Sequence, residues 1–132
     1  SPAEKTLFLR GYLNLAVRGE LAVEDRLAMC RQAAGLIARD DEKRLLLGTL
    51  SNIESPDTAG LIAPYLDDAS CRQEAVLAVV TVAEKLLRQD PAPFAAKLIP
   101  SLEKAAQAAA NEDLAKRAKA VLAQAKDKAG AK

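Results

Sequence analysis

Apolar residues recur at intervals of three and four along nearly the whole chain, and Gly, Pro, Asp, Asn and Ser interrupt the runs. This period places the apolar side chains on one face of an α-helix, whereas a half-buried strand would alternate every second residue. The interruptions are residues that start and stop helices. The pattern therefore predicts about seven antiparallel helices joined by short loops, over residues 1–18, 23–39, 41–53, 55–66, 69–89, 91–109 and 112–126, with a frayed tail over 127–132.

Capping residues mark several of the predicted helix starts. Ser1 and Glu4 have the spacing of a capping box, Ser55 precedes a proline, and Gly19 is expected to end the first helix. Acidic pairs also lie at predicted N-termini, where a carboxylate accepts hydrogen bonds from free backbone N–H groups and complements the helix dipole. We therefore interpret them as capping groups rather than as a catalytic dyad or a Ca²⁺ site. These pairs are Asp40-Asp41, Asp67-Asp68 and Glu112-Asp113.

The predicted helices also repeat along the chain. A helix that opens at Arg44 aligns with one that opens at Arg72, 28 residues later, and the segment 61–66 aligns with 97–102, 36 residues later. The difference of eight residues is about two helical turns, so the longer unit keeps the same face buried. The spacing favours a repeat of two helices with units that lengthen toward the C-terminus.

The predicted second helix has two apolar stripes separated by a polar strip. A helix with two apolar faces packs on two sides, as in a stack of helix layers. One stripe contains Leu27, Cys30, Ala34 and Ile37, and the other contains Met29, Ala33 and Leu36.

Composition supports an all-helical chain and excludes several kinds of chemistry. Half of the 132 residues are hydrophobic but only 3% are aromatic, and Ala and Leu favour helices that approach one another closely. The chain has no His, which excludes His-dependent nucleophilic catalysis and His-ligated metal sites. A net charge of +1 provides no overall attraction to nucleic acid or anionic lipid, and no apolar run approaches the roughly 20 residues of a membrane span.

The two cysteines have different predicted surroundings. Cys30 lies on an apolar stripe and is interpreted as a small buried hydrophobic residue. Cys71 is placed in the first turn of the fifth helix, where the helix dipole would lower its pKa, so a reactive thiol is the alternative there to a structural one. We expect no disulfide between them, because they lie on helices of non-adjacent pairs.

Arg44 and Arg72, at the starts of two first helices, and Pro64 and Pro100, within two second helices, resemble the pattern of HEAT-type, armadillo-like repeats. The resemblance covers nearly the whole chain and is clearest over 41–126. It implies an all-α, right-handed α-α superhelix in a single domain. Each proline removes one backbone hydrogen bond and is expected to impose a fixed bend on its helix.

The segments 10–13, 42–44 and 64–68 also resemble HEAT-like modules of large bacterial exported proteins, where such modules accompany other domains and mediate contacts. This resemblance implies a bacterial extracytoplasmic segment, periplasmic or secreted, with a cytoplasmic location as the alternative. The chain begins at Ser1 without Met, so we expect a segment of a longer polypeptide.

Polar residues on the second helices are the candidate partner-binding residues. They are Gln32 and Arg39 on the second predicted helix, and Lys97 and Lys104 on the sixth. The HEAT-like resemblance implies that second helices line a concave surface, where these side chains would meet a partner. Ordinary solvated polarity is the alternative interpretation.

The last predicted helix is basic. Lys116, Lys119 and Lys126 project within about 80° of one another on an ideal helix. Such a patch contacts phosphates in some nucleic-acid-binding proteins, but no aromatic residues interleave to stack on bases. The alternative, which we favour, is the solvated outer face of a terminal helix.

These observations predict a non-catalytic protein–protein interaction or scaffold module. Its partner would be another protein or a neighbouring domain of the same polypeptide. Nucleic-acid binding through the basic helix is the alternative, followed by a HEAT-like lyase or glycosylase-type enzyme. We predict no cofactor, metal or catalytic residue, because the sequence has no dinucleotide-binding, P-loop, nucleophile-elbow or metal-spaced motif.

Overall fold

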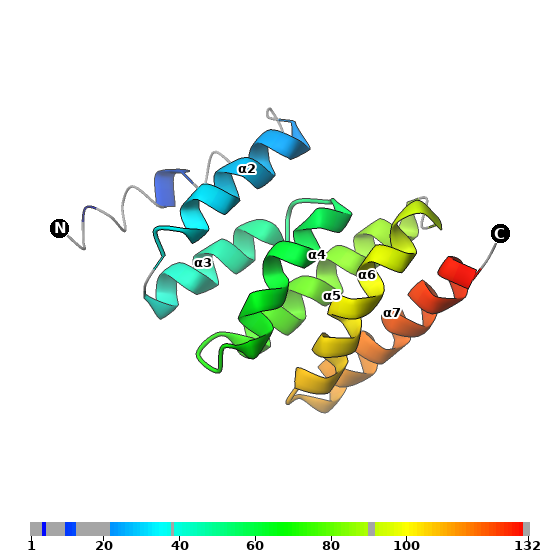
Figure 1. Cartoon of the computed structure of the whole chain (residues 1–132). Helices are drawn as coiled ribbons and strands as arrows, with labels where there is room; N and C mark the ends of the chain where they lie inside the picture. The colour runs from blue at the N-terminus through cyan, green and yellow to red at the C-terminus, as the bar shows by residue number, and fades with distance from the viewer. Residues whose placement is uncertain (1–3, 5–9, 13–21, 38, 90–91, 131–132) are drawn as a thin grey trace.

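The computed structural model describes residues 4, 10–12, 22–37, 39–89 and 92–130, and within that part of the chain the regular secondary structure is entirely helical (Figure 1). The predicted all-α class is therefore confirmed. The first predicted helix, with its Ser1 cap and Gly19 stop, lies largely outside the described residues, as does the Asp90-Pro91 helix start. The further elements are α2 (Val23–Ala34), α3 (Asp40–Leu50), α4 (Pro56–Ile62), the 3-10 helix η1 (Ala63–Asp67), α5 (Arg72–Arg88), α6 (Ala92–Ala108) and α7 (Glu112–Gly130).

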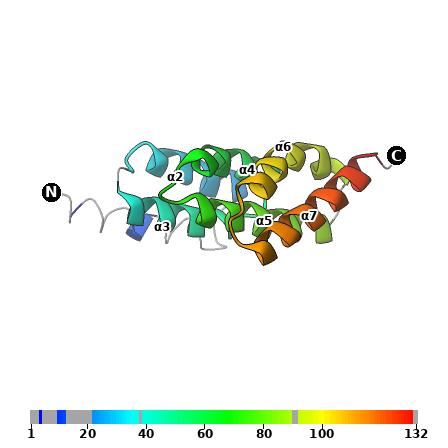
Figure 2. The ribbon, with the colours of Figure 1, turned by 90° about the horizontal axis from the view of Figure 1, so that it is seen from below.

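The helices form two layers, and successive helices lie in alternate layers. Figure 2 shows α2, α4 and α6 along one side and α3 and α5 along the other, with α7 inclined across the end of the row. We call the first of these the α2–α4–α6 layer. Short connections place each helix beside the one before it, as expected for antiparallel neighbours. The row extends from α2 at one end to α7 at the other (Figure 1).

The core is centred on α5, which packs on α3, α4, η1, α6 and α7. Its buried residues cover more than one face of the helix and are small, so neighbouring helices approach closely from several directions. They are Ala75, Val76, Ala78, Val79, Val80, Val82, Ala83 and Leu86. Leucines of α3 and α6 and Ile62 of α4 complete the core around them.

Two described helices have side-chain N-caps, and the one at Ser55 was predicted. The side chain of Ser55 accepts a hydrogen bond from the backbone N–H of Asp57 at 3.2 Å, and Pro56 opens α4. At α7 the cap is Asn111, which accepts from the N–H groups of Asp113, at 2.8 Å, and Leu114, at 3.2 Å. In each case the side chain satisfies donors that have no partner within the helix. The predicted pair Glu112-Asp113 lies in the first turn of α7 rather than at its cap.

Helix α2 is shorter than the sequence predicts, ending at Ala34 instead of Arg39. The N–H of Gly35 bonds to the carbonyl of Gln32 at 3.2 Å, which tightens the last turn and ends the helix. Arg39 then has an extended backbone and is the N-cap residue of α3, where its N–H donates to the Glu42 carboxylate at 3.0 Å. The prediction that Arg39 belongs to the second helix was wrong, and Asp40 and Asp41 lie in the first turn of α3 rather than at its cap.

The fifth and last helices also differ from the predicted bounds. Helix α5 begins at Arg72, three residues later than expected, because residues before it form a turn in which Asp68 accepts from the N–H of Ser70 at 3.0 Å. Helix α7 continues to Gly130, so residues 127–130 are helical and not a frayed tail.

The aligned helix pairs differ in local detail. The α-helix gives way to 3-10 geometry at Ala63, next to Pro64, whereas α6 continues through Pro100. Arg44 pairs with Glu74 of α5 at 3.3 Å, whereas Arg72 donates to the carbonyl of Leu66 at 3.0 Å. Equivalent positions in the sequence therefore make different contacts.

Candidate binding groove and charged surface

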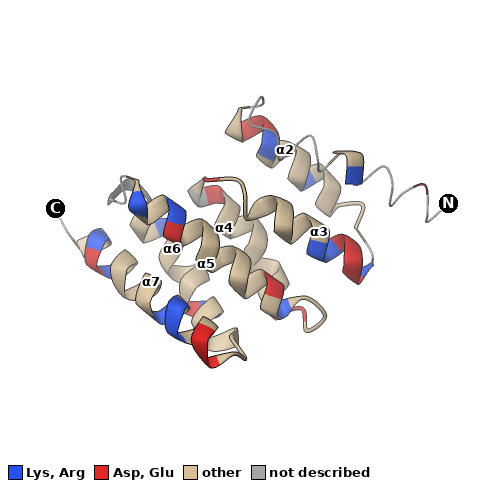
Figure 3. Ribbon diagram, turned by 180° about the vertical axis from the view of Figure 1, so that it is seen from behind, with Lys and Arg blue, Asp and Glu red and all other residues tan. Residues whose placement is uncertain are grey.

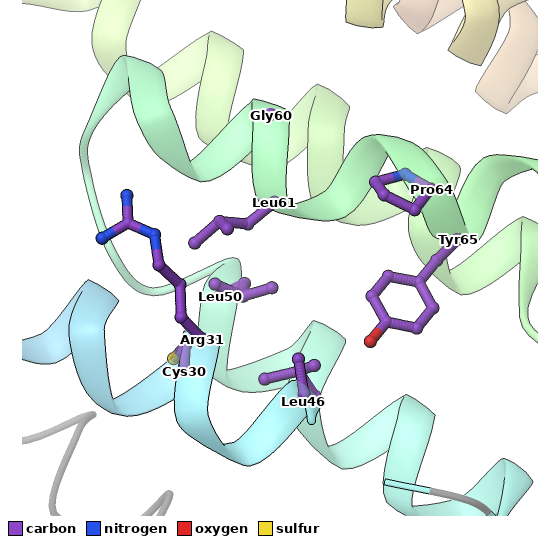
Figure 4. A pocket seen from close by; sticks show the side chains of 9 residues that line it. Cys30, Arg31, Leu46, Leu50, Gly60, Leu61, Pro64 and Tyr65 are labelled. Atoms are coloured by element: carbon purple, nitrogen blue, oxygen red, sulfur yellow. The ribbon is translucent and has the colours of Figure 1, made fainter. Parts of the chain in front are cut away.

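An apolar groove opens between α2 and the segment formed by α4 and η1 (Figure 4). We call it the α2–α4 groove, and its volume is about 240 Å³. Helix α3 supplies its floor, and the other two segments supply its walls. The lining residues are Cys30, Arg31 and Ala34 from α2, Leu46 and Leu50 from α3, and Gly60, Leu61, Pro64 and Tyr65 from the α4–η1 segment.

Small side chains keep the groove open. Ala34 is exposed although it belongs to a stripe predicted to be covered, and Gly60 and Pro64, which also line the groove, are exposed as well. A methyl group added at Gly60 would meet no heavy atom within 4 Å. The space beside Gly60 is therefore empty rather than filled by a neighbouring side chain.

The floor and the rim differ in chemistry. Leu46 and Leu50 are each 1% exposed and belong to the core, while Leu61 and Tyr65 are half-buried. Burial raises the pKa of Tyr65, so its phenol stays neutral. Figure 4 shows the Tyr65 ring pointing toward Leu46, with the Arg31 side chain extended along the rim near Leu61. Among the described residues that line the groove, Arg31 is the one that carries a charge.

The structure places the candidate partner-binding residue Gln32 within α2 and the candidate Arg39 outside it. Gln32 is exposed on α2 and accepts a hydrogen bond from the Tyr12 hydroxyl. Arg39 lies beyond the end of α2 and pairs with Asp41 at 3.3 Å. Gln32 and Arg39 therefore do not share one strip of a helix, as the sequence had suggested.

The two candidates on α6 share a helix but have different surroundings. Lys97 is exposed, and no carboxylate of a described residue lies within 4 Å of it. Lys104 pairs with Asp67, at the end of η1, at 2.8 Å. Neither lysine lines the α2–α4 groove.

Carboxylates lie beside most of the basic candidates of α7. Lys116 pairs with Glu112 at 3.7 Å, and Lys126 pairs with Glu103 of α6 at 3.8 Å. Lys119 is exposed and has no such neighbour in the described part of the chain. Figure 3 shows basic and acidic segments next to each other on this helix. The three lysines therefore share a helix with compensating charge and do not form a purely positive surface.

A polar cluster joins the start of α3 to the turn before α5. Lys43 Nζ lies 2.7 Å from Asp68 Oδ2 and 3.5 Å from Ser70 Oγ, and Ser70 Oγ donates to Asp68 Oδ1 at 2.7 Å. The hydrogen bonds from Lys43 and Ser70 lower the pKa of Asp68 to about 2, and the Asp68 bond raises the pKa of Lys43. Lys43 is thus held protonated, so it does not serve as a base for the Ser70 hydroxyl.

Both cysteines are buried and free. Burial raises the pKa of Cys30 to about 11, as expected for a structural residue. The pKa of Cys71 is also raised, first by burial and then by the charge of Asp68, so the predicted lowering by the helix dipole was wrong. Cys71 occupies the N-cap position of α5 rather than its first turn, and its sulfur faces the carbonyl oxygen of Tyr65 at 3.9 Å.

Searches of the described residues find no group of acidic and sulfur ligands arranged to hold a metal ion, and no helix long and apolar enough to cross a bilayer. Comparison of the chain with protein-family models, with curated proteins and with solved structures finds no match.

Sequence reasoning did not identify the α2–α4 groove. The pattern contains a partial signal, because Ala34 extends an apolar stripe and Gly60 interrupts a helix without ending it. The groove itself depends on the distance between two helices that are not consecutive, which periodicity does not report.

Proposed function

We propose that this chain is a HEAT-like helical repeat module, wound as a right-handed superhelix, that binds a partner protein through its α2–α4–α6 layer. The partner is a separate protein or a neighbouring domain of the same polypeptide. The module acts without catalysis, by presenting a preformed surface. The alternation of helices between two layers supports this proposal, because such stacks expose one helix of each pair along an extended face (Figure 2).

The observation that carries the proposal is the α2–α4 groove. It is lined mainly by apolar residues yet open to solvent, with Ala34, Gly60 and Pro64 exposed along it. Binding energy at protein interfaces concentrates in a few anchor side chains that enter such pockets. A rigid helical floor at Leu46 and Leu50 gives that anchor a preformed site.

The charges of α7 favour a protein partner over nucleic acid. Affinity for a phosphate backbone rises with the number of uncompensated cations. On α7, Arg117 donates to Glu84 at 2.6 Å, and Lys116 and Lys126 each lie within 4 Å of a carboxylate. These acids weaken the positive field, so we rank nucleic-acid binding second.

Catalysis is ranked third because of the residues that line the groove. The described residues that line the α2–α4 groove include no Asp or Glu, so they do not supply the convergent carboxylates that a lyase or glycosylase uses. The Lys43–Asp68 ion pair holds the nearby amine in its charged form.

Site-specific photo-crosslinking tests the proposed face. A benzophenone amino acid is placed at position 32 or 97, both exposed on the α2–α4–α6 layer, or at position 119 of α7 as the matched exposed control. The full-length polypeptide is irradiated in cells of its source. We expect the same crosslinked partner, or the same intramolecular domain, from positions 32 and 97 and little from position 119.

Equal crosslinking from all three positions, or none from positions 32 and 97, would contradict the proposal. Nucleic acid recovered from position 119 alone would support the second-ranked function instead. In that case, reversing Lys116, Lys119 and Lys126 to Glu should abolish a salt-sensitive binding.

A further inference from the structure

The volume of the α2–α4 groove limits what can occupy it. This volume is about 240 Å³. Pockets that enclose whole drug-sized ligands span roughly 300–1,000 Å³. The α2–α4 groove is smaller, and its size suits one large apolar side chain.

The walls select an apolar occupant. Leucines of α3 form the floor, and Leu61, Pro64 and Ala34 add carbon surface along the walls. Water inside such a groove finds few hydrogen-bond partners, so its replacement by carbon is favourable. A partner side chain of the size of Leu, Phe or Trp would gain this contribution on entry.

The positive charge of Arg31, at the rim of the groove, favours an acidic residue beside the apolar side chain of the partner. Arg31 is exposed, and no carboxylate of a described residue lies within 4 Å of its guanidinium. A guanidinium at the edge of an apolar groove attracts a carboxylate and holds it by paired hydrogen bonds.

A second groove, between α3 and α5, provides an internal comparison. It has a volume of about 200 Å³, and its lining combines apolar residues such as Leu47 and Leu77 with the polar residues Ser51 and Thr81 and with a charged pair. Its cation, Arg44, already pairs with Glu74 at 3.3 Å. We call it the α3–α5 groove, and it resembles the α2–α4 groove in size while offering no unpaired cation.

We propose that the α2–α4 groove receives one Leu, Phe or Trp side chain from an acidic segment of the partner, with an Asp or Glu of that segment bound to Arg31. This inference rests on the proposed function and names the kind of segment that the α2–α4–α6 layer recognises. Charge complementarity at Arg31 and the volume of the groove are the observations that carry it.

The two glycines that line the grooves allow a matched pair of variants. Gly60 lines the α2–α4 groove and Gly48 lines the α3–α5 groove, and an added Cβ meets no heavy atom within 4 Å at either position. Gly60→Met should fill the first groove, and Gly48→Met should fill the second. Both variants should fold, because each replaces a helical glycine with a better helix former in open space.

The test is a selection from a phage library of random twelve-residue peptides against the whole 132-residue chain. The wild type and Gly48→Met should enrich peptides that carry Leu, Phe or Trp within four residues of Asp or Glu. Gly60→Met should bind the best of these peptides at least about tenfold more weakly, as expected for loss of an anchor pocket. Arg31→Glu should enrich Lys and Arg beside the same apolar anchor.

Several outcomes would overturn the inference. They are enrichment without acidic residues, equal binding by Gly60→Met, an unchanged preference in Arg31→Glu, or no enrichment above an unrelated helical protein. If Gly60→Met fails to fold, Gly60→Ala and the surface variant Arg31→Glu decide the question.

A small amphiphile shares the chemistry of an apolar chain with a carboxylate, so decanoate is tested in parallel. Decanoate binding that depends on Arg31 and Gly60, with no enriched peptide, would also overturn the inference. Crosslinks from positions 32 and 97 together with a failed peptide selection would leave the proposed function standing without this groove as its anchor.

Discussion

At the residue scale, the polar cluster around Asp68 joins several hydrogen bonds on one carboxylate. Asp68 accepts hydrogen bonds from Lys43 and from both the backbone and the hydroxyl of Ser70. These bonds favour the charged carboxylate, which is why its pKa falls to about 2 from an ordinary 3.8. The cluster connects α3 to the turn before α5, so its charge state affects how two helices of one layer are joined.

Replacing Asp68 with Asn should lower the melting temperature at pH 7, because the amide keeps the shape but loses the charge. A carboxylate whose pKa is depressed on folding stabilises the protein above its unfolded pKa, and this contribution is lost as the pH falls through the folded value. The difference between wild type and Asp68→Asn should therefore shrink as the pH falls from about 4 to about 2. Thermal unfolding followed by circular dichroism across this range measures the difference.

Asp67→Asn is the matched control. Asp67 adjoins Asp68 and pairs with Lys104, but its side chain is 71% exposed, and exposed pairs contribute little. Its melting temperature should stay close to that of the wild type at every pH. A difference for Asp68→Asn that persists unchanged at pH 2 would show that its effect does not come from charge.

The two thiols should be inert in the folded protein. With a pKa of about 11, Cys30 is about 0.1% thiolate at pH 8, against about 10% for a thiol at the ordinary 9.0. Reaction with a chromogenic disulfide reagent should thus be at least about 100-fold slower in buffer than in urea, for burial blocks access as well. A fast phase amounting to one thiol in the native protein would contradict the expected inertness, and repeating the reaction on Cys71→Ser would show which thiol reacts.

At the element scale, helix starts were easier to predict than helix ends. The starts of α4 and α7 depend on side chains at their own N-caps, Ser55 and Asn111, so local sequence was sufficient. The end of α2 depends on the turn at Gly35. Apolar residues continue beyond this glycine, at Leu36 and Ile37, so the pattern predicted a longer helix. The sequence predicted that α7 ends at residue 126, although no residue there stops a helix. The helix therefore continues to Gly130.

The candidate site was less predictable than the helices. The all-α class follows from a period of three to four residues, a local property of the chain. The α2–α4 groove depends on how far α2 lies from α4, which are separated by the whole of α3. Sequence placed Cys30 and Ala34 on one stripe, but burial of Cys30 and exposure of Ala34 follow from tertiary packing.

The cap at Asn111 should contribute measurably to the last helix. Asn111→Ala removes the acceptor for two backbone N–H groups and should lower the free energy of unfolding by about 1 kcal/mol. Urea denaturation measures the loss, and amide exchange should accelerate at Asp113 and Leu114. Asn111→Ser retains a capping oxygen and should stay near wild type, so an equal loss in both variants would contradict the capping role.

At the scale of the whole molecule, contacts are shared unequally among the helices. Helix α5 contacts α3, α4, η1, α6 and α7, whereas α2 packs on α3 at one end of the row (Figure 1). Opening α5 therefore requires most of the molecule to open. Among the described elements, α2 has fewer neighbours to lose than α5.

Hydrogen exchange should reflect this arrangement. Amides in the middle of α5, near Val79 and Val80, should exchange most slowly and require global unfolding, whereas those of α2 should exchange through local opening. Exchange measured by mass spectrometry resolves the two helices. Equal protection in α2 and α5 would indicate a single cooperative unit in which the end helix is as firmly held as the centre.

The placement of α2 and α7 at opposite ends of the row has a mechanical consequence. Tension applied between these two helices along the row is borne by the junctions between neighbouring helices in series. The weakest junction then sets the force at which the molecule begins to yield. Helix α7 packs on both α6 and α5, whereas α2 packs on α3, so the molecule should lengthen first near α2 while the centre remains folded. Joined to other domains, the module would behave as an extensible spacer whose compliance resides on the α2 side of the row.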